Sequence, residues 1–520
     1  MDRIKARLKN FLASEIGMLA ILGLITLVSF GIFVPFTGFY WDDWIWKFFS
    51  SAYSSEYLLW QPVDRPLAGT LHILLNRLFA DDPLKWQLGN LFFRWANAAG
   101  FYYLMRRVLP ARKDIPAILA IIFLVFPVFS EQWISIAFIH HLVPMSVLWI
   151  SFILMFTAVE TKPRGKRLGL FGLSIFLAVL VMLTTEYFYG IEAFRVVLLV
   201  YLLRKQSPQK KISGVLWETV KLWWAYAAVI ILMVAWRAGL GVAEGASYAV
   251  HLNRMFTAGI PAGIWNFISM VASGIYSATV VVFGKLFTIP QSAELGLFKT
   301  VFFYVLIVVT LSLFLIYFHG LFSRNTVEKR TAFELIALGL GGLVIGGLPF
   351  WVGGLQYQPS FPDDRLGLPL MLGASFLVVG LILLLSRYRR VVSVVLAIVA
   401  TLSVGTNYLT GAAYAKSWAE QQVFWRQFVT RVPNLEPGTA VITAQLPPDF
   451  MNDLSFMMTL NWLYDQNPNE ESLQYGLFFS DSRGMLETIS AQMPLVYDQR
   501  MVKFESEIEK SLVISYNQNS

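Results

Sequence analysis

Two adjacent carboxylates, Asp42 and Asp43, stand inside an aromatic run that extends from Phe39 to Trp46. The run follows a long apolar segment, so it is expected at the edge of a membrane, where Trp and Tyr commonly form a belt. Such a belt explains the aromatic residues, Trp44 among them, but not the aspartates. Carboxylates near lipid are costly unless they are paired or solvated, and they tend to be retained for a function. An aspartate can also begin a helix as its N-cap, and this structural alternative stays open.

The next loop expected on the same side of the membrane carries Glu131. This residue would complete an acidic site with Asp42 and Asp43 if the two loops converge, and otherwise it is a solvated interfacial residue. The loop ends near His140 and His141. Adjacent positions on a helix diverge by about 100°, so one metal ion would not reach both rings without ligands from elsewhere. His140 is kept as a candidate substrate-binding residue, together with Trp44 of the aromatic run and Glu186 of a later loop.

Two further segments place charged side chains on the same side. Glu186 lies at the turn between two closely linked apolar segments, where helix capping is the structural alternative. Arg365 follows Asp363 and Asp364 and is one of few cations expected on that side. Its guanidinium can bind a phosphate bidentately, or it can pair with either neighbouring aspartate.

The composition excludes an ordinary soluble protein, because 56% of the 520 residues are hydrophobic and 14% are charged. There is no cysteine, so disulfides, thiolate chemistry and cysteine zinc sites are excluded. The formal charge of +8 is attributed to cytoplasmic loops of a membrane protein, and no nucleic-acid partner is expected. We find no phosphate-binding glycine loop, dinucleotide fingerprint or metalloprotease motif in a sequence context that would support its function.

Apolar runs long enough to cross about 30 Å of hydrocarbon recur along the chain. We predict an all-α polytopic membrane protein with about eleven transmembrane helices. The segment 264–287 is treated as an outer amphipathic or re-entrant helix, and 66–80 as a helix along the outer surface. The predicted spans are 16–36, 84–105, 115–129, 142–159, 168–185, 187–203, 217–236, 300–318, 331–350, 367–385 and 391–409.

The basic residues predict the orientation of these spans. With the N-terminus inside, the cytoplasmic segments hold 22 Lys and Arg residues, beginning with the cluster Arg3, Lys5, Arg7 and Lys9. The opposite side holds nine in much longer loops, if the C-terminal region is left out. Lys and Arg are enriched in cytoplasmic loops, so the N-terminus is expected in the cytoplasm and the C-terminus outside it.

The character of the chain changes near residue 410. We predict a transmembrane domain over 1–409, with a first outer loop over 37–83, and a small soluble α/β domain over 410–520 outside the cytoplasm. The C-terminal region has a net charge of −6. An amphipathic helix is predicted over 418–432 and strands over 439–446, 501–504 and 512–516.

Four short motifs in the first 205 residues resemble those of the GT-C glycosyltransferases, membrane-embedded enzymes that include bacterial members using polyprenyl-phosphate-linked sugars. One departure is Gln87, which stands where many relatives carry a histidine. The matching motifs are Asp42-Asp43 after the first span, Arg65-Pro66-Leu67, Leu88-Gly89-Asn90 at the second span, and Phe126-Pro127 followed by Glu131 and Trp133.

The resemblance implies inverting transfer of a sugar from a polyprenyl-phosphate donor to a glycan, lipid or protein acceptor, in cell-envelope glycan biosynthesis. Asp42 or Asp43 would act as the base or organise the acceptor; as a base, a positioned carboxylate can take the proton of the acceptor hydroxyl. Arg65 and Arg365 would balance the charge of the departing phosphate. Together with Glu131, the aspartates are compatible with a divalent metal, Mg²⁺ or Mn²⁺, or with none.

The resemblance also implies a bacterial inner (plasma) membrane. Two rival functions remain: a transporter or lipid flippase, and a non-catalytic assembly subunit of the same fold.

Overall fold

The protein is described by a computed structural model. The basic cluster at 3–9 lies outside the described residues. The structure describes residues 14–53, 59, 65–110, 112–244, 256–322, 328–444, 448–465, 468, 472–480, 489, 491–499 and 502–515.

The described residues contain eight helical segments that are long and apolar enough to cross a membrane. Lipid offers the backbone no hydrogen-bond partner, so helices are the expected form of such segments. The chain is therefore a polytopic, mainly helical membrane protein, as predicted. The eight segments are Glu15–Phe36, Ser135–Glu160, Arg164–Thr184, Ile212–Gly239, Ile260–Lys285, Leu297–Phe322, Lys329–Val352 and Arg389–Arg431.

All eleven predicted spans are helical, but four of them are not among these eight. α7 (Asp114–Val125) and α18 (Leu370–Leu383) have 12 and 14 residues, which at 1.5 Å per residue gives only about 18 and 21 Å. α6 (Pro83–Val108) and α10 (Tyr189–Gln206) are longer but carry several charged side chains.

The segment predicted as an outer amphipathic or re-entrant helix over 264–287 overlaps one of the candidate spans, Ile260–Lys285. It comprises α13 (Ile260–Tyr276), the short π-helix η4 (Ser277–Val281) and α14 (Val282–Lys285). Its polar residues are small, so they do not prevent the segment from being apolar over 26 residues. Only 17% of its most apolar stretch is buried within the protein, which leaves most side chains free to face lipid.

Two helix boundaries also differ from those predicted. α8 (Ser135–Glu160) begins seven residues before the predicted span at 142, so the loop that carries Glu131 is shorter than expected. α19 (Arg389–Arg431) is one helix of 43 residues, where the sequence predicted a span followed by a separate amphipathic helix. This helix contains no Pro. Its two glycines, Gly405 and Gly411, do not interrupt it.

Contacts divide the chain into two compact units, each built from separated segments. Unit 1 comprises the described parts of 1–32, 91–131 and 141–410, and unit 2 those of 33–90, 132–140 and 411–520. The predicted boundary near 410 coincides with one of these divisions. Unit 2 additionally includes the described part of the predicted first outer loop.

Unit 1 is a bundle of helices. The helices not yet given bounds are α2 (Glu15–Thr26), α9 (Arg164–Thr184), α11 (Ile212–Glu244), α15 (Ser292–Leu295), α16 (Leu297–Phe322) and α17 (Lys329–Val352).

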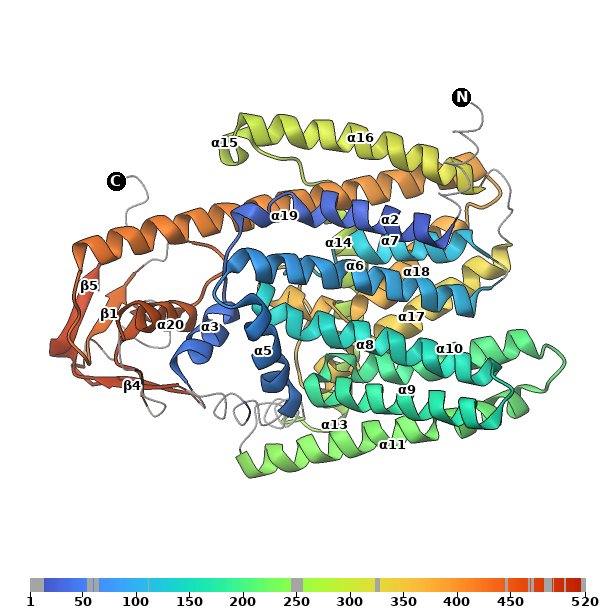
Figure 1. Ribbon diagram of the computed structural model, residues 1–520, viewed down its shortest axis with the longest axis horizontal. Coiled ribbons are helices and arrows are strands. Elements are labelled where there is room, and N and C mark those ends of the chain that lie inside the picture. Colours follow the sequence, from blue (N-terminus) through green and yellow to red (C-terminus); the bar gives the residue numbers. More distant parts are fainter. Residues whose placement is uncertain are drawn as a thin grey trace. The chain divides into compact units, whose positions relative to one another are not determined.

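Glycines allow close packing in this bundle. A Cβ atom on Gly339 would lie 2.5 Å from the backbone nitrogen of Leu377, so α17 and α18 approach closely and lie side by side (Figure 1).

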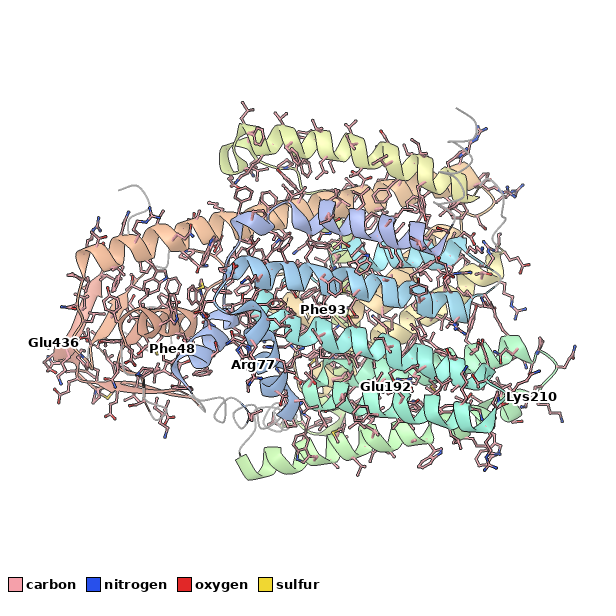
Figure 2. The ribbon with its side chains drawn as sticks, viewed as in Figure 1. Phe48, Arg77, Phe93, Glu192, Lys210 and Glu436 are labelled. Carbon is pink, nitrogen blue, oxygen red and sulfur yellow. The ribbon has the colours of Figure 1, made fainter. Side chains whose placement is uncertain are left out.

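A buried ion pair also stabilises unit 1. Glu192 and Arg195 are both fully buried on α10, and the guanidinium donates to both carboxylate oxygens at 2.6 and 2.7 Å. The same guanidinium donates to the Ser151 hydroxyl of α8 at 2.8 Å and lies over the ring of Tyr226 on α11. Figure 2 labels Glu192 within this group of helices. The charges are paired and hydrogen-bonded, which is the condition under which buried charges are tolerated.

Unit 2 combines helices with short strands. α20 (Asp453–Tyr464) begins at the N-cap Asn452, whose side chain accepts from the Ser455 N–H, and it packs on α3 and on β2. The unit also contains α3 (Asp42–Ala52) and α5 (Pro66–Phe79), the latter within the range predicted for a surface helix, together with the parts of α6, α8 and α19 that fall within its ranges.

The strands of unit 2 form two small sheets. β1 (Ala440–Thr443) lies between β2 (Gly476–Phe479) and β5 (Ser511–Ile514), and both pairings are parallel. β3 (Leu495–Gln499) and β4 (Val502–Ser506) form an antiparallel pair. β1, β4 and β5 overlap the three predicted strands, and the sequence analysis did not predict β2 and β3. The small α/β composition of the C-terminal region is confirmed.

Candidate functional site

Asp43 anchors the start of α3 to the start of α8. Its side chain is fully buried, and its Oδ2 accepts from the backbone N–H groups of Tyr40 at 3.2 Å and Ser135 at 3.0 Å. Its Oδ1 accepts from the N–H of Ala137 at 2.9 Å. The first N–H groups of a helix have no partner within the helix, and a carboxylate satisfies them well. Asp43 therefore caps a helix, as the structural alternative proposed. The helix that it caps is α8, however, and not the helix that follows it in the sequence.

Two opposing effects act on the pKa of Asp43. Burial raises the pKa well above its ordinary value, because a carboxylate loses its hydration. The backbone donors of Tyr40, Ser135, Ile136 and Ala137 lower it, since they favour the charged form. These groups also occupy the carboxylate, so Asp43 is suited to hold the loops together.

Asp42, by contrast, is half-buried at the first position of α3. Trp41 precedes it with φ of 42°, a left-handed conformation that is costly for a bulky residue. The Trp41 N–H donates to the Phe450 carbonyl at 3.1 Å, which helps to hold that conformation. The strained residue lets the chain turn so that two neighbouring aspartates have different environments.

The aromatic run around these aspartates is buried within unit 2 and does not form an exposed belt. Trp44 is 5% exposed, and its indole N–H donates to the Gln421 side chain of α19 at 3.2 Å. Its ring lies 5.8 Å from that of Trp462 on α20. The Tyr40 hydroxyl donates to the Tyr414 carbonyl at 2.7 Å. These contacts give Trp44 and Tyr40 a packing role in placing the start of α3.

Lys47 lies on α3 one turn after the aspartates, and the sequence analysis counted it only as a loop charge. Its side chain is 1% exposed, its ammonium pairs with the Asp81 carboxylate, and burial lowers its pKa to about 8. Asp81 itself is 70% exposed on its side chain, so a competing anion can reach the pair from solvent. A single lysine within the predicted first outer loop gave no pattern by which to identify it.

His72 on α5 is also close to α3. Its ring is fully buried and lies 4.6 Å from Trp46, 5.8 Å from Trp86 and 5.2 Å from the ring of His140. Within the described part of the chain neither ring nitrogen has a hydrogen-bond partner. Burial, with the nearby charge of Lys47, lowers the pKa of His72 to about 3, so the ring is neutral. His140 is thus placed next to His72, and the sequence analysis had not singled out His72.

The other motif residues of the resemblance tie these loops together. Gln87 donates its amide to the carbonyls of Gly38 at 2.9 Å and Trp133 at 2.6 Å. Asn90 donates to the Gln132 carbonyl at 2.5 Å. Both residues lie on α6, so this helix holds the loop before α3 and the loop before α8. Arg65 is half-buried and immediately precedes α5, where its carbonyl accepts the Ala68 N–H at 2.8 Å.

Glu131, Glu186 and Arg365 belong to unit 1. Glu131 is fully buried in the loop before α8. Glu186 begins the short helix η3 (Glu186–Phe188) and accepts from the Arg237 guanidinium of α11 at 3.1 Å. Arg365 is half-buried in η5 (Asp363–Gly367), where Asp364 accepts a hydrogen bond from the Ser130 hydroxyl.

The structure therefore brings together five of the eight predicted site residues within unit 2 and the other three within unit 1. The five are Asp42, Asp43, Trp44, Arg65 and His140. Among the described residues, no group of three or more His, Asp or Glu side chains is arranged to hold a metal ion. The predicted divalent metal, like the roles of the eight residues, stays a prediction.

No family model and no curated protein matches the chain. Among solved structures, a crystal structure of ArnT from Cupriavidus metallidurans bound to undecaprenyl phosphate is similar over 94% of this chain and 89% of that chain. Its sequence identity is 13% and its TM-score 0.44. A structure of the same protein in the apo state is similar over 84% of this chain and 83% of that chain, with 10% identity and a TM-score of 0.35.

Proposed function

We propose that this protein is a GT-C-type membrane glycosyltransferase, which transfers a sugar from a polyprenyl-phosphate donor to an acceptor hydroxyl. The observation that carries the proposal is the division of labour between the two aspartates. Asp43 is fully buried and capped by backbone donors, whereas Asp42, the adjacent residue, is half-buried at the start of the same helix. A rigidly anchored neighbour is what a catalytic carboxylate needs to be held in position.

In the proposed reaction Asp42 is the general base. Its carboxylate takes the proton of the acceptor hydroxyl as the hydroxyl oxygen attacks the anomeric carbon of the donor sugar. The new bond joins that oxygen to the anomeric carbon, and the bond between the anomeric carbon and the phosphate oxygen breaks. The polyprenyl phosphate leaves with the bonding electron pair. Attack opposite the leaving group inverts the anomeric centre.

The departing phosphate needs a cation, and unit 2 offers two. Arg65 is the predicted one, and its planar guanidinium suits bidentate binding of phosphate. Lys47 is the one added by the structure, because its ammonium lies on the same helix as Asp42 and its partner Asp81 is mostly solvent-exposed. We propose that the phosphate of the donor competes with Asp81 for Lys47. The identity of the donor lipid rests on the resemblance of the sequence motifs to GT-C enzymes.

The proposal includes the orientation predicted from the basic loops. The N-terminus lies in the cytoplasm of a bacterial cell, and the C-terminal region lies outside the inner membrane. Transfer then takes place on the outer face, onto a glycan, lipid or protein acceptor.

Transfer by the purified protein in liposomes tests the proposal. The assay supplies radiolabelled polyprenyl-phosphate sugars and membrane extract as a source of acceptors, and it compares wild type with Asp42→Asn. The matched control is Asp82→Asn. Asp82 is also partly exposed at the start of a helix, and it has no role in the proposed reaction. Transfer by wild type and by the control, but not by Asp42→Asn, supports the proposal. Full transfer by Asp42→Asn refutes the assignment of the base.

A further inference from the structure

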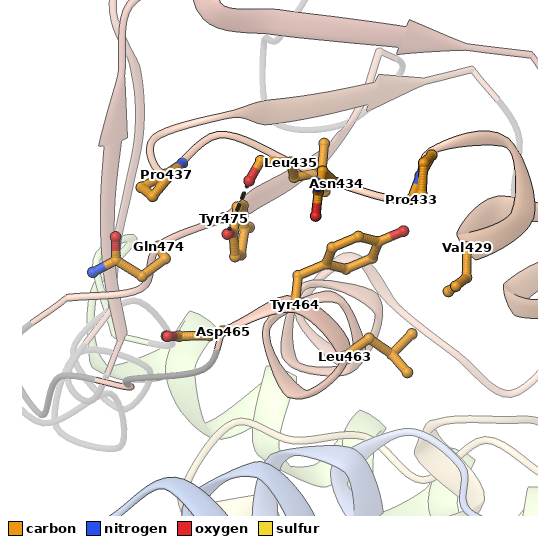
Figure 3. A pocket seen from close by; sticks show the side chains of 10 residues that line it. All are labelled: Val429, Pro433, Asn434, Leu435, Pro437, Leu463, Tyr464, Asp465, Gln474 and Tyr475. Atoms are coloured by element: carbon orange, nitrogen blue, oxygen red, sulfur yellow. Dashed lines mark hydrogen bonds between the residues drawn. The ribbon is translucent and has the colours of Figure 1, made fainter.

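The C-terminal region contains a cavity of about 530 Å³, within the range of about 300–1,000 Å³ that is common for small-ligand pockets. It lies where the end of α19, the end of α20 and the segments leading into β1 and β2 meet (Figure 3). All of its lining residues belong to unit 2. They are Val429, Pro433, Asn434, Leu435, Pro437, Leu463, Tyr464, Asp465, Gln474 and Tyr475.

Two tyrosines hold the wall of this cavity in place. The Tyr464 hydroxyl donates to the Val432 carbonyl at 2.5 Å, and the Tyr475 hydroxyl donates to the Leu435 carbonyl at 3.2 Å. The latter bond is drawn in Figure 3. Each hydroxyl is thus used to fix the loop after α19, and each ring is fixed with it. A wall that is ordered before a ligand arrives loses little entropy on binding.

The backbone adds to this order. Pro433 and Pro437 restrict the same loop, since proline fixes φ near −65°. Gly438 closes the loop in a left-handed conformation with φ of 88°, and its N–H donates to the Gln474 carbonyl at 2.8 Å. A residue with a side chain would be strained at that position. The loop is therefore tied both to α20 and to the segment before β2.

The lining chemistry fits an uncharged sugar ring. Asp465 supplies a carboxylate and Asn434 and Gln474 supply amides, which together both donate to and accept from vicinal hydroxyl groups. Tyr464 and the aliphatic side chain of Leu463, which is 39% exposed, offer apolar surface for the C–H face of a pyranose. None of the ten lining residues is Lys, Arg or His, and residues 410–520 have a net charge of −6. An anionic ligand is therefore disfavoured.

We propose that this cavity binds a neutral pyranose residue, with its C–H face against Tyr464 and its hydroxyls hydrogen-bonded to Asp465, Asn434 and Gln474. We further assign this pyranose to the acceptor glycan, and that second assignment rests on the proposed function. The cavity would then select glycan acceptors over lipid or protein acceptors that lack a sugar.

Direct binding to the full-length protein in lipid nanodiscs tests the first assignment. Saturation-transfer NMR is recorded with methyl glycosides of glucose, galactose and mannose and with N-acetylglucosamine, and with glucuronate and glucosamine as charged probes. At least one neutral probe should bind, and Asp465→Asn should weaken its affinity about tenfold, as expected for loss of a hydrogen bond to a charged group. Asp498→Asn, an exposed aspartate on β3, is the matched control and should bind as wild type does.

Asn434→Ala provides a second variant if Asp465→Asn does not fold, because Asn434 is exposed and its loss should not affect folding. It too should weaken binding of the neutral probe. The proposal is overturned if no neutral pyranose binds wild type, if both pocket variants bind as wild type does, or if a charged probe binds more tightly than every neutral one.

A transfer assay separates this result from the proposed function. If both are correct, Asp465→Asn raises the KM for a glycan acceptor several-fold and leaves the KM for the donor unchanged. Pyranose binding without any transfer by wild type would refute the transferase proposal and keep the sugar site. Transfer that is insensitive to Asp465→Asn and Asn434→Ala would refute the acceptor assignment and keep the transferase.

Discussion

Replacing each aspartate of the pair by asparagine should have opposite consequences for stability and activity. Asp43→Asn keeps the shape of the side chain but turns one oxygen into an NH₂ group. In the better of its two orientations, the amide oxygen keeps the donors of Tyr40 and Ser135, and the NH₂ group faces the N–H of Ala137. One hydrogen bond is then lost and two others lose the charge of their acceptor.

The cost follows from the usual size of these interactions. A hydrogen bond to a charged group contributes about 1.5–3 kcal/mol and a neutral one about 0.5–1.5 kcal/mol. Losing one charged bond and weakening two others by about 1 kcal/mol each gives a loss of about 3.5–5 kcal/mol in the free energy of unfolding. Asp42→Asn removes a favourable charge at the start of α3, which is worth about 0.3–1 kcal/mol.

Unfolding in mixed micelles of increasing SDS fraction, followed by tryptophan fluorescence, measures the two effects. Asp43→Asn should unfold at a markedly lower SDS fraction than wild type, and Asp42→Asn should unfold close to wild type while losing transfer. If Asp43→Asn is within about 1 kcal/mol of wild type, its buried hydrogen bonds do not anchor α3 and the reasoning fails.

Three further predictions concern other buried groups and the orientation. The pKa of His72 is lowered from 6.5 to about 3. Below pH 6.5 the unfolded chain therefore binds a proton at this histidine that the folded chain does not bind. This difference should lower the free energy of unfolding by about 1.4 kcal/mol per pH unit down to about pH 3. His72→Phe should be about as stable as wild type at pH 7, and the wild-type stability minus that of the variant should fall on acidification; a constant difference contradicts the buried neutral ring. Arg195→Met should destabilise the protein by about 3–5 kcal/mol because it leaves Glu192 buried without its partner, and adding Glu192→Leu should recover much of that loss; additive losses in SDS unfolding would count against the pair. A phosphatase that works only outside the cytoplasm should be active when it is fused after Ser520. Activity of a cytoplasmic reporter fused at the same position would reverse the predicted orientation.

Local chemistry explains why the helices could be predicted from the sequence. In lipid every backbone group needs a partner within its own segment, so an apolar run of sufficient length forms a helix whatever it packs against. The segment over 260–285 was predicted as an outer amphipathic or re-entrant segment because of its Asn and Ser residues, although its length and hydropathy are also sufficient for a span. The strands β2 and β3 were missed, and the parallel pairing of β2 with β1 could not be predicted from a local pattern because it joins segments more than thirty residues apart.

The sequence by itself determined that this is a polytopic helical membrane protein with an α/β C-terminal region, and that the pair Asp42–Asp43 needs an explanation beyond an aromatic belt. Only the tertiary structure decided which aspartate is the anchor, because the donors at Ser135 and Ala137 lie more than ninety residues away from Asp43. It likewise paired Lys47 with Asp81 and placed the ring of His72 against Trp46 of α3. Hydropathy depends on residue type alone, whereas burial and hydrogen bonding depend on neighbours that are distant in the chain.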